Sequence, residues 1–413
     1  MTSTLYICYF GVREPLVQTQ VLPYLREVKK DGVDVSLLTF EPDFKNKWSK
    51  SEVEEQRAHF ADEGITWHVT AYHKTPSVPA TAFDIFNGAR IVWSLLRKNK
   101  YDILHGRVHI PTLMGALARK FSGHKPKLLF DIRGFFPEEY TDAGRWPENG
   151  IIYRTAKRIE KWLMKESDGF VVLTEKAREI LFPESKETGR DKLGRPVEVI
   201  PCCVDMERFK IATPEMRQKM RSELKLDGRN VVVYVGSFGG WYLTEETADL
   251  FAAAKKLDPS TFAMILTQSD PQEIKPLLLE RGFTDADMLI QKVPSNELPK
   301  YLCAADVAVS FIKKCYSKQA SSPTKNAEYL ACGLPIIANS GVGDVDSLIL
   351  DNQVGVLIDT FETNELVAAV EKITDLGDIG EKCRQTSREL FDLKEIGGTR
   401  YRNLYGRITG ELK

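Results

Sequence analysis

Short runs of consecutive apolar residues recur along the whole chain, separated by stretches in which apolar residues return every three or four positions. The short runs are typical of strands buried on both faces, and the longer spacing is typical of amphipathic helices. The first half predicts strands at 5–10, 33–40, 65–72, 102–105, 127–133, 169–174 and 197–201. The second half predicts strands at 231–236, 262–267, 288–293, 306–312, 335–340 and 354–359. This alternation predicts parallel, doubly wound sheets with right-handed crossovers.

Amphipathic helices are predicted between these strands. They cover 18–31, 82–98, 151–166, 245–256, 295–304 and, beyond the last strand, 394–412. Residues 203–209 show neither period, and the connection between the two halves is expected between them and about Asn230. The fold class is therefore α/β with two Rossmann-like domains, at 1–203 and 204–392, and a final helical segment at 393–413. Ligands are expected where the two domains face each other, at the carboxyl ends of the strands.

Composition narrows the range of possible functions. The chain has 413 residues, which favours two or more domains, and a formal net charge of −1 from 57 basic and 58 acidic residues. That balance argues against nucleic acid as a partner. The seven cysteines are scattered without a zinc spacing, which predicts a reduced, cytoplasmic protein with no metal site. The start lacks a basic leader, and no apolar run is long enough to span a membrane, so any membrane contact is expected to be peripheral.

One segment of the second half has the pattern of an anion-binding helix. Ser322 is predicted as the N-cap, Pro323 as the first helical residue, and Gly333 as the position where the helix ends. Lys325 and Glu328 are three residues apart and so share one face near the helix N-terminus. A capped N-terminus with a lysine suits an anion, and a carboxylate one turn later suits sugar hydroxyls. The combination predicts a phosphorylated ligand that carries a ribose.

Two glycine-containing loops follow strands of the same half. Residues 236–242 let a ligand approach the backbone closely and carry Trp241, which could stack on a base or sugar. In residues 341–344, exposed amides could meet phosphate oxygens. Each loop alone is explained by an ordinary turn, whereas all of them on one domain favour a ligand site. The candidate contacts are Gly236, Ser237, Lys318 and Lys325 for phosphate, and Trp241, Ser322 and Thr324 for the base or sugar.

Three strand ends of the first half carry polar residues. Gly11 could bring backbone N–H groups to a diphosphate, and His109, Asp131 and Arg133 lie at the ends of two further strands. His109 is alternatively an ordinary core or surface histidine, and Arg133 is alternatively a structural ion-pair partner of Glu138.

Residues 200–209 (Ile-Pro-Cys-Cys-Val-Asp…Arg-Phe) and 322–335 (Ser-Pro-Thr-Lys…Glu-Tyr-Leu-Ala…Gly-Leu-Pro) resemble the GT-B fold glycosyltransferases of group 1, family 4 type. The resemblance covers nearly the whole chain and is greatest to bacterial enzymes that build surface polysaccharides. It implies a retaining transfer of sugar from a nucleotide diphosphate sugar, of UDP or GDP type, to a hydroxyl of a glycan or lipid-linked acceptor. The first domain would bind the acceptor, the second the donor, and the last helix would cross back to the first domain.

The resemblance also implies residue roles. Glu328 would hold the ribose, Lys325 the diphosphate, and Gly11 would approach the same phosphates. His109, Asp131 and Arg133 would act in catalysis by orienting sugar and acceptor. No cofactor and no metal is implied, since the nucleotide sugar is a substrate.

The chain departs from the family pattern at two places. Ala320 stands eight residues before Glu328, where the family often has a second glutamate, and the 236–241 loop lacks the usual arginine and lysine. A non-catalytic nucleotide-sugar or carbohydrate-binding homologue therefore stays an alternative. A dinucleotide-dependent oxidoreductase is a further one, although its nearest fingerprint, residues 341–346, lacks the third glycine. The basic helix at 151–166 is either a solvated surface helix or a peripheral contact with anionic lipid at the cytoplasmic face of the membrane.

Overall fold

The computed structural model describes residues 2–30 and 32–411, and over these residues the chain forms two compact units. One unit contains the residues up to Pro201 together with those from Gly397 on, and the other is Cys202–Ile396. The expected domain limits were 203/204 and 392/393, whereas the unit limits are 201/202 and 396/397. The helix predicted at 18–31 ends at Asp31, and the predicted final segment ends with residues 412–413. These three positions lie outside the described residues.

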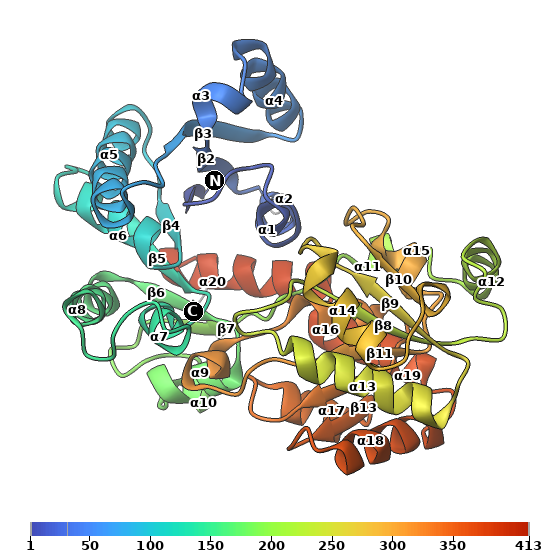
Figure 1. Ribbon diagram of the computed structural model, residues 1–413. Helices are drawn as coiled ribbons and strands as arrows, with labels where there is room; N and C mark the ends of the chain where they lie inside the picture. The colour runs from blue at the N-terminus through green and yellow to red at the C-terminus, as the bar shows by residue number, and fades with distance from the viewer. Residues whose placement is uncertain (1, 31, 412–413) are drawn as a thin grey trace. The chain divides into compact units, whose positions relative to one another are not determined.

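In its described residues the first unit holds a seven-stranded parallel sheet of order β3-β2-β1-β4-β5-β6-β7 (Figure 1). Its strands are β1 (Ser3–Cys8), β2 (Asp34–Pro42), β3 (Ile65–Tyr72), β4 (Ile103–Arg107), β5 (Lys127–Ile132), β6 (Gly169–Val172) and β7 (Val197–Val199). Its helices are α1 (Pro15–Gln20), α2 (Leu22–Lys29), α3 (Phe44–Lys47), α4 (Lys50–Asp62), α5 (Ser77–Lys98), α6 (His109–Lys120), α7 (Phe136–Asp142), α8 (Ile151–Glu166), α9 (Glu175–Leu181), α10 (Ser185–Thr188) and α20 (Thr399–Thr409).

The described residues of the second unit form a six-stranded parallel sheet of order β10-β9-β8-β11-β12-β13. Its strands are β8 (Asn230–Val235), β9 (Thr261–Leu266), β10 (Met288–Gln291), β11 (Val307–Ser310), β12 (Ile336–Asn339) and β13 (Gly355–Ile358). Its α-helices are α11 (Met206–Phe209), α12 (Pro214–Glu223), α13 (Thr244–Leu257), α14 (Lys275–Glu280), α15 (Leu298–Leu302), α16 (Thr324–Ala331), α17 (Val345–Asn352), α18 (Thr363–Asp375) and α19 (Gly380–Phe391). Short 3-10 turns η1 (Pro271–Glu273), η2 (Asp285–Asp287) and η3 (Tyr316–Ala320) and a π-helical turn η4 (Leu393–Gly398) join them.

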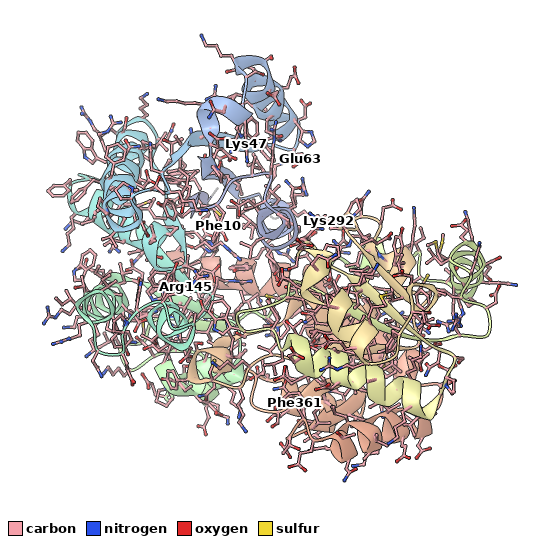
Figure 2. The ribbon with its side chains drawn as sticks, in the orientation of Figure 1. Phe10, Lys47, Glu63, Arg145, Lys292 and Phe361 are labelled. Carbon is pink, nitrogen blue, oxygen red and sulfur yellow. The ribbon has the colours of Figure 1, made fainter. Side chains whose placement is uncertain are left out.

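The apolar runs form strands because both faces of each sheet are covered. In β8, Val231 and Val233 belong to one hydrophobic cluster, while Val232 and Tyr234 belong to the cluster on the opposite face. Successive side chains of a strand point to opposite faces, so a strand covered on both sides must be apolar at every position. The second cluster extends past β13, where Phe361, labelled in Figure 2, packs edge-on against Phe311 of the core.

The predicted fold class is confirmed, and each predicted strand is found with ends that differ by a few residues. The single helix predicted at 18–31 is wrong. The structure has α1 and α2 instead, because Pro23 has no N–H to donate to Thr19 and suits only the first turn of a new helix. Residues 203–209 showed no period, yet they contain α11, which Asp205 caps through the backbone N–H of Glu207.

The last helix, α20, belongs to the first unit and packs on α2 and β7. Figure 1 shows this red helix beside strands from the first half of the chain. The predicted segment 394–412 is thus confirmed as helical over its described part, although its first turn is the π-helical η4. Among the described residues, no helix is both long enough and apolar enough to cross a membrane.

Candidate functional site

Helix α16 follows β11 and η3 in the chain and precedes β12. Its first turn therefore lies at the carboxyl end of the second sheet. The helix begins at Thr324, with Pro323 as the N-cap in an extended conformation. The prediction of Ser322 as N-cap and Pro323 as first helical residue is therefore wrong by one position. The Ser322 hydroxyl instead accepts a hydrogen bond from the backbone N–H of Cys202, at 3.1 Å.

The end of α16 is as predicted. Gly333 has φ +81°, its N–H donates to the carbonyl of Leu330, and the N–H of Leu334 donates to the carbonyl of Tyr329. This pair of bonds is a Schellman motif, which needs the left-handed conformation that glycine adopts at no steric cost. A Cβ at position 333 would also lie 2.3 Å from the Arg384 guanidinium. The helix therefore ends sharply, and its residues from Lys325 on are buried.

Lys325 places a buried amine at the start of this helix. Its Nζ lies 4.3 Å from the centre of the Tyr234 ring and 5.0 Å from that of Tyr242, and a Cβ on Gly236 would lie 3.6 Å from it. Within the described residues Nζ has no hydrogen-bond partner. Burial lowers the pKa of Lys325 to about 7, because no anion compensates the loss of water around the ammonium.

Glu328, one turn later, is also buried but is already paired. Its Oε1 accepts a hydrogen bond from Arg208 Nη2 of α11 at 2.7 Å. Burial raises the pKa of Glu328, and the Arg208 guanidinium opposes that rise. Within the described residues Oε2 accepts no hydrogen bond, so one carboxylate oxygen is available to hydroxyl donors. The two segments that carry the family resemblance thus touch each other, through this ion pair and through Ser322.

Lys318 lies in η3 with its Nζ 4.0 Å from the centre of the Trp241 ring. The carbonyl of Lys318 accepts a hydrogen bond from the N–H of Gly343, while the N–H of Gly341 donates to the Asp346 side chain. The prediction that the amides of residues 341–344 face a phosphate is therefore wrong for both glycines, because those amides hold η3 and α17 in place.

Two backbone groups of the loop after β8 are also used in hydrogen bonds within the second unit. Gly236, at φ +139°, donates its N–H to the Leu266 carbonyl at 3.1 Å. The carbonyl of Ser237 accepts a hydrogen bond from the Tyr234 hydroxyl at 2.6 Å. Glycine suits this position chiefly because φ is +139°, since an added Cβ would lie only in ordinary van der Waals contact with Lys325 Nζ.

Several buried polar atoms of the second unit have no hydrogen-bond partner among the described residues. They are Nζ of Lys325, Nε1 of Trp241, Nε of Arg208 and both amide atoms of Asn326. Buried polar atoms are nearly always satisfied, so a group of them on α11, α16 and the loop after β8 indicates a polar ligand. Asn326 carries no predicted role, and Arg208 stands out in the sequence only as part of the family motif. Adjacent residues of a helix do not share a face, so the position of Asn326 directly after Lys325 gave no signal.

In the first unit, His109 begins α6 and is buried. Its Nε2 lies 2.9 Å from Glu160 Oε2 of α8, and its ring packs against Phe130 and Phe136. Burial alone would raise the pKa of Glu160, but the hydrogen bond and charge of His109, with Lys157, lower it. Val108, just before, has φ +60°, which is rare for a β-branched residue. No hydrogen bond or ion pair among the described residues joins His109 to Asp131 or Arg133.

Asp131 lies in a separate buried network that holds α20. Its Oδ2 accepts a hydrogen bond from the Tyr401 hydroxyl at 2.9 Å and lies 3.4 Å from His105 Nε2, and its Oδ1 lies 3.8 Å from Arg133 Nη1. Burial alone would raise the pKa of Asp131, but the charges of Arg133, His105 and Arg107 lower it. The alternative pairing of Arg133 with Glu138 is wrong, since Glu138 pairs with Lys157. The catalytic roles of His109, Asp131 and Arg133 stay predictions.

Gly11 is buried against a carboxylate. A Cβ there would lie 2.6 Å from Glu41 Oε2, and the N–H of Val12 donates to Glu41 Oε1 at 2.8 Å. The structure thus gives a packing reason for the glycine. Its approach to a diphosphate stays a prediction, and that approach would have to accommodate the negative charge of Glu41. Among the described residues no group of three or more histidine, cysteine, aspartate or glutamate side chains could hold a metal ion.

Comparisons with known proteins agree with this arrangement. The family model described as "Glycosyl transferases group 1" matches residues 215–390, and the model described as "Glycosyltransferase Family 4" matches residues 17–208. The 2-deoxystreptamine glucosyltransferase of Streptomyces kanamyceticus is 25% identical over 224 residues, which are 52% of this chain and 54% of that protein. The chain thus spans about half the length of the curated relatives it matches.

Solved structures are similar over almost the whole chain. A glycosyltransferase from Rickettsia africae has a TM-score of 0.70 at 16% identity and covers 98% of each chain. The Anabaena protein Alr3699/HepE, solved in complex with UDP, has a TM-score of 0.69 at 16% identity, covering 98% of this chain and 99% of that one. At this identity the likeness shows the fold alone.

Proposed function

Because this chain belongs to the group 1 glycosyltransferases of GT-B fold, we propose that it is a retaining enzyme that needs no metal ion. It would move a sugar from a nucleotide diphosphate sugar to a hydroxyl of a glycan or lipid-linked acceptor, in the biosynthesis of surface polysaccharide or another glycoconjugate.

The observation that carries the proposal is the buried amine of Lys325 at the first turn of α16, which has no hydrogen-bond partner in the described part of the chain. A diphosphate placed there would meet an ammonium and helix N-terminal dipoles, and it would supply the negative charge that the buried amine lacks. Lys318, also buried and in the turn just before α16, would contribute a second positive charge. Both side chains contact aromatic rings, which keep water away and so strengthen the attraction.

The chemistry follows from the leaving group. As the bond between the anomeric carbon and the diphosphate oxygen breaks, its electron pair leaves with the nucleoside diphosphate. Lys325, Lys318 and the N-terminus of α16 would stabilise that charge by preorganised electrostatics. The acceptor oxygen would bond to the same face of the anomeric carbon, and its proton would pass to the departing phosphate. Retention of configuration results.

The nucleoside would be held by Glu328. Its Oε1 is fixed by Arg208, so Oε2 would accept the hydroxyls of the ribose. Trp241, Ser322 and Thr324 are proposed contacts of the base or sugar, and His109, Asp131 and Arg133 are proposed to orient sugar and acceptor in the first unit. UDP is the first donor nucleotide to test, because the Anabaena protein was solved with UDP and with UDP-glucose. GDP is the second.

Cytoplasmic action with a peripheral membrane contact is the proposed setting when the acceptor is lipid-linked. Arg154, Arg158, Lys161 and Lys165 form an exposed basic stripe along α8, beside the exposed Ile151. Co-sedimentation with vesicles containing anionic lipid tests this contact. The double variant Arg158→Glu, Lys161→Glu should lose binding, and equal binding of both proteins would leave α8 a solvated helix.

The decisive experiment combines donor binding with turnover. Purified protein is screened by thermal shift against UDP- and GDP-sugars, since a bound donor raises the melting temperature. Donor consumption and the anomeric configuration of the product are then followed by NMR, with and without EDTA. The proposal fails if no nucleotide sugar is bound or turned over and Lys325→Ala behaves like the wild type. An inverted product would refute retention, and loss of activity in EDTA would refute metal independence.

A non-catalytic homologue is the second candidate function, because of Ala320. Its side chain is buried at the position eight residues before Glu328, so no carboxylate reads the donor sugar from there. Donor binding without hydrolysis or transfer, across a broad set of acceptors, would favour this candidate.

A further inference from the structure

A histidine–aspartate pair lies at the carboxyl end of the first sheet, apart from His109. His73 directly follows β3, and its Nδ1 lies 2.6 Å from Oδ1 of Asp84 in α5. The other oxygen of Asp84 accepts hydrogen bonds from the backbone N–H of His73 and from the hydroxyl of Tyr9. Tyr9 follows β1 and precedes Phe10, which is labelled in Figure 2.

The surroundings fix which ring nitrogen carries the proton. Asp84 is fully buried, and within the described residues no lysine or arginine pairs with it. In the tautomer that this contact favours, Nδ1–H donates to Oδ1 of Asp84. Nε2 of that tautomer carries the lone pair, has no hydrogen-bond partner in residues 2–30 and 32–411, and belongs to a side chain that is 45% exposed. An oriented hydrogen-bond acceptor therefore faces solvent.

An exposed aromatic side chain lies beside the His73 ring. The Phe83 ring stands perpendicular to the His73 ring at 5.1 Å between centres, and it is 56% exposed. Tyr72 precedes His73, and its ring meets that of Tyr9 at 5.0 Å. Exposed aromatic faces attract the weakly positive C–H groups of a ring, while Nε2 accepts a hydroxyl proton. Both properties fit a ring-shaped polyol.

We propose that His73 is an acceptor-binding residue whose Nε2 accepts a hydrogen bond from one hydroxyl of a sugar or cyclitol, with Asp84 as the positioning residue that fixes the ring. This inference rests on the proposed function, because it assigns the acceptor of that reaction. The carboxyl end of a doubly wound sheet is where ligands of this fold class bind. No local sequence pattern marks the pair, because Asp84 lies eleven residues further on, inside a helix.

A purely structural role can be separated from binding. Asp84 also anchors the backbone of His73, so the pair could serve only to hold the turn between β3 and α5. Asparagine at position 73 can still donate an N–H to Asp84 but has no acceptor atom where Nε2 lies. Glutamine has an acceptor near that place but loses the link to Asp84. His59 of α4, exposed and 3.5 Å from Glu63, is a matched control in the same unit.

The test uses UDP-glucose as donor, with p-nitrophenyl glycosides of glucose, galactose and mannose and myo-inositol as acceptors, and mass spectrometry of the products. His73→Asn should raise the acceptor KM about tenfold, as loss of one hydrogen bond implies. The donor KM, the hydrolysis of UDP-glucose without acceptor and the melting temperature should stay at wild-type values. His73→Gln should recover part of the acceptor KM, and His59→Asn should match the wild type throughout.

Each other outcome overturns the inference. An unchanged acceptor KM in His73→Asn would leave only a structural role. Equal loss of donor hydrolysis would mean that the substitution damages the fold or the donor site. A wild type that hydrolyses UDP-glucose but glycosylates none of these polyols would refute the inference and leave the proposed function standing. A wild type that neither binds nor turns over any nucleotide sugar would refute both.

Discussion

The protonation of Lys325 gives the sharpest test of the proposed donor site. Burial lowers the pKa of its amine from 10.5 to about 7. One pKa unit corresponds to 1.36 kcal/mol, so charging this amine in the folded, unliganded protein costs roughly 5 kcal/mol more than charging it in water. A bound diphosphate places negative charge beside Nζ and removes most of that cost. Nucleotide binding should therefore take up a proton.

The expected uptake follows from the fraction of neutral amine before binding. If a bound diphosphate restores the usual pKa, UDP binding takes up about 0.5 proton at pH 7 and about 0.9 at pH 8 through this residue. Isothermal titration calorimetry in buffers of different ionisation enthalpy measures the number of protons. Lys325→Met removes the titrating group at similar volume, and Lys313→Met, an exposed lysine of the same unit, is the control. Uptake that is equal in wild type and Lys325→Met would refute the reasoning.

The same pKa predicts a pH dependence of stability without any ligand. Between pH 7 and 10.5 the unfolded chain binds this proton and the folded chain does not, so the free energy of unfolding rises with pH. This gain in the free energy of unfolding is complete above about pH 10.5, and it is lost as the pH falls toward 7. Lys325→Met should remove a rise of roughly 4 kcal/mol between pH 7 and pH 10, measured by urea unfolding. Parallel pH profiles of wild type and variant would contradict the assignment.

Three further substitutions test other contacts. Glu328→Gln should weaken UDP binding about tenfold in calorimetry, because a neutral amide accepts ribose hydroxyls less strongly than a carboxylate does; an unchanged Kd would exclude Glu328 from the ribose site. Tyr401→Phe removes the hydroxyl that donates to Asp131 and should cost about 1–3 kcal/mol in urea unfolding, whereas no loss would mean that α20 does not depend on this bond. Gly333→Ala should cost at least about 1 kcal/mol in the same assay, since φ is +81° and the new Cβ would meet Arg384; a neutral effect would refute the steric argument.

The sequence predicted the strands well because both faces of each sheet are covered. Burial on both sides leaves a run that is apolar at every position, and such runs are visible without any knowledge of the neighbours. Helix boundaries were less predictable, because they depend on single residues. Pro23 divides one predicted helix, and the hydroxyl of Ser322 serves a distant N–H in place of capping α16.

Site residues could be predicted where neighbours in sequence carry the signal. Lys325 and Glu328 are three residues apart on one helix, so their spacing was informative. The pairing of Glu328 with Arg208 joins positions 120 residues apart, and no local pattern contains it. Asp131 shows that a position in the sequence can also suggest a role that the contacts do not support. Its place at a strand end suggested catalysis, but its contacts reach Tyr401, 270 residues away, and its side chain is fully buried.

The contrast between Lys325 and Glu328 predicts what the proposed donor site would recognise. The Glu328 charge is compensated by Arg208 before any ligand arrives, so a ribose gains only the hydrogen bonds to the remaining oxygen. The Lys325 charge has two aromatic rings beside it but no anion or hydrogen-bond partner among the described residues, so an anion also regains part of the energy lost in burying the amine. A ligand with a diphosphate should therefore be preferred strongly over the same nucleoside without phosphate. With Ala320 contributing no carboxylate, selection of the sugar must come from other residues, and affinity for the diphosphate can be high while discrimination between sugars stays low.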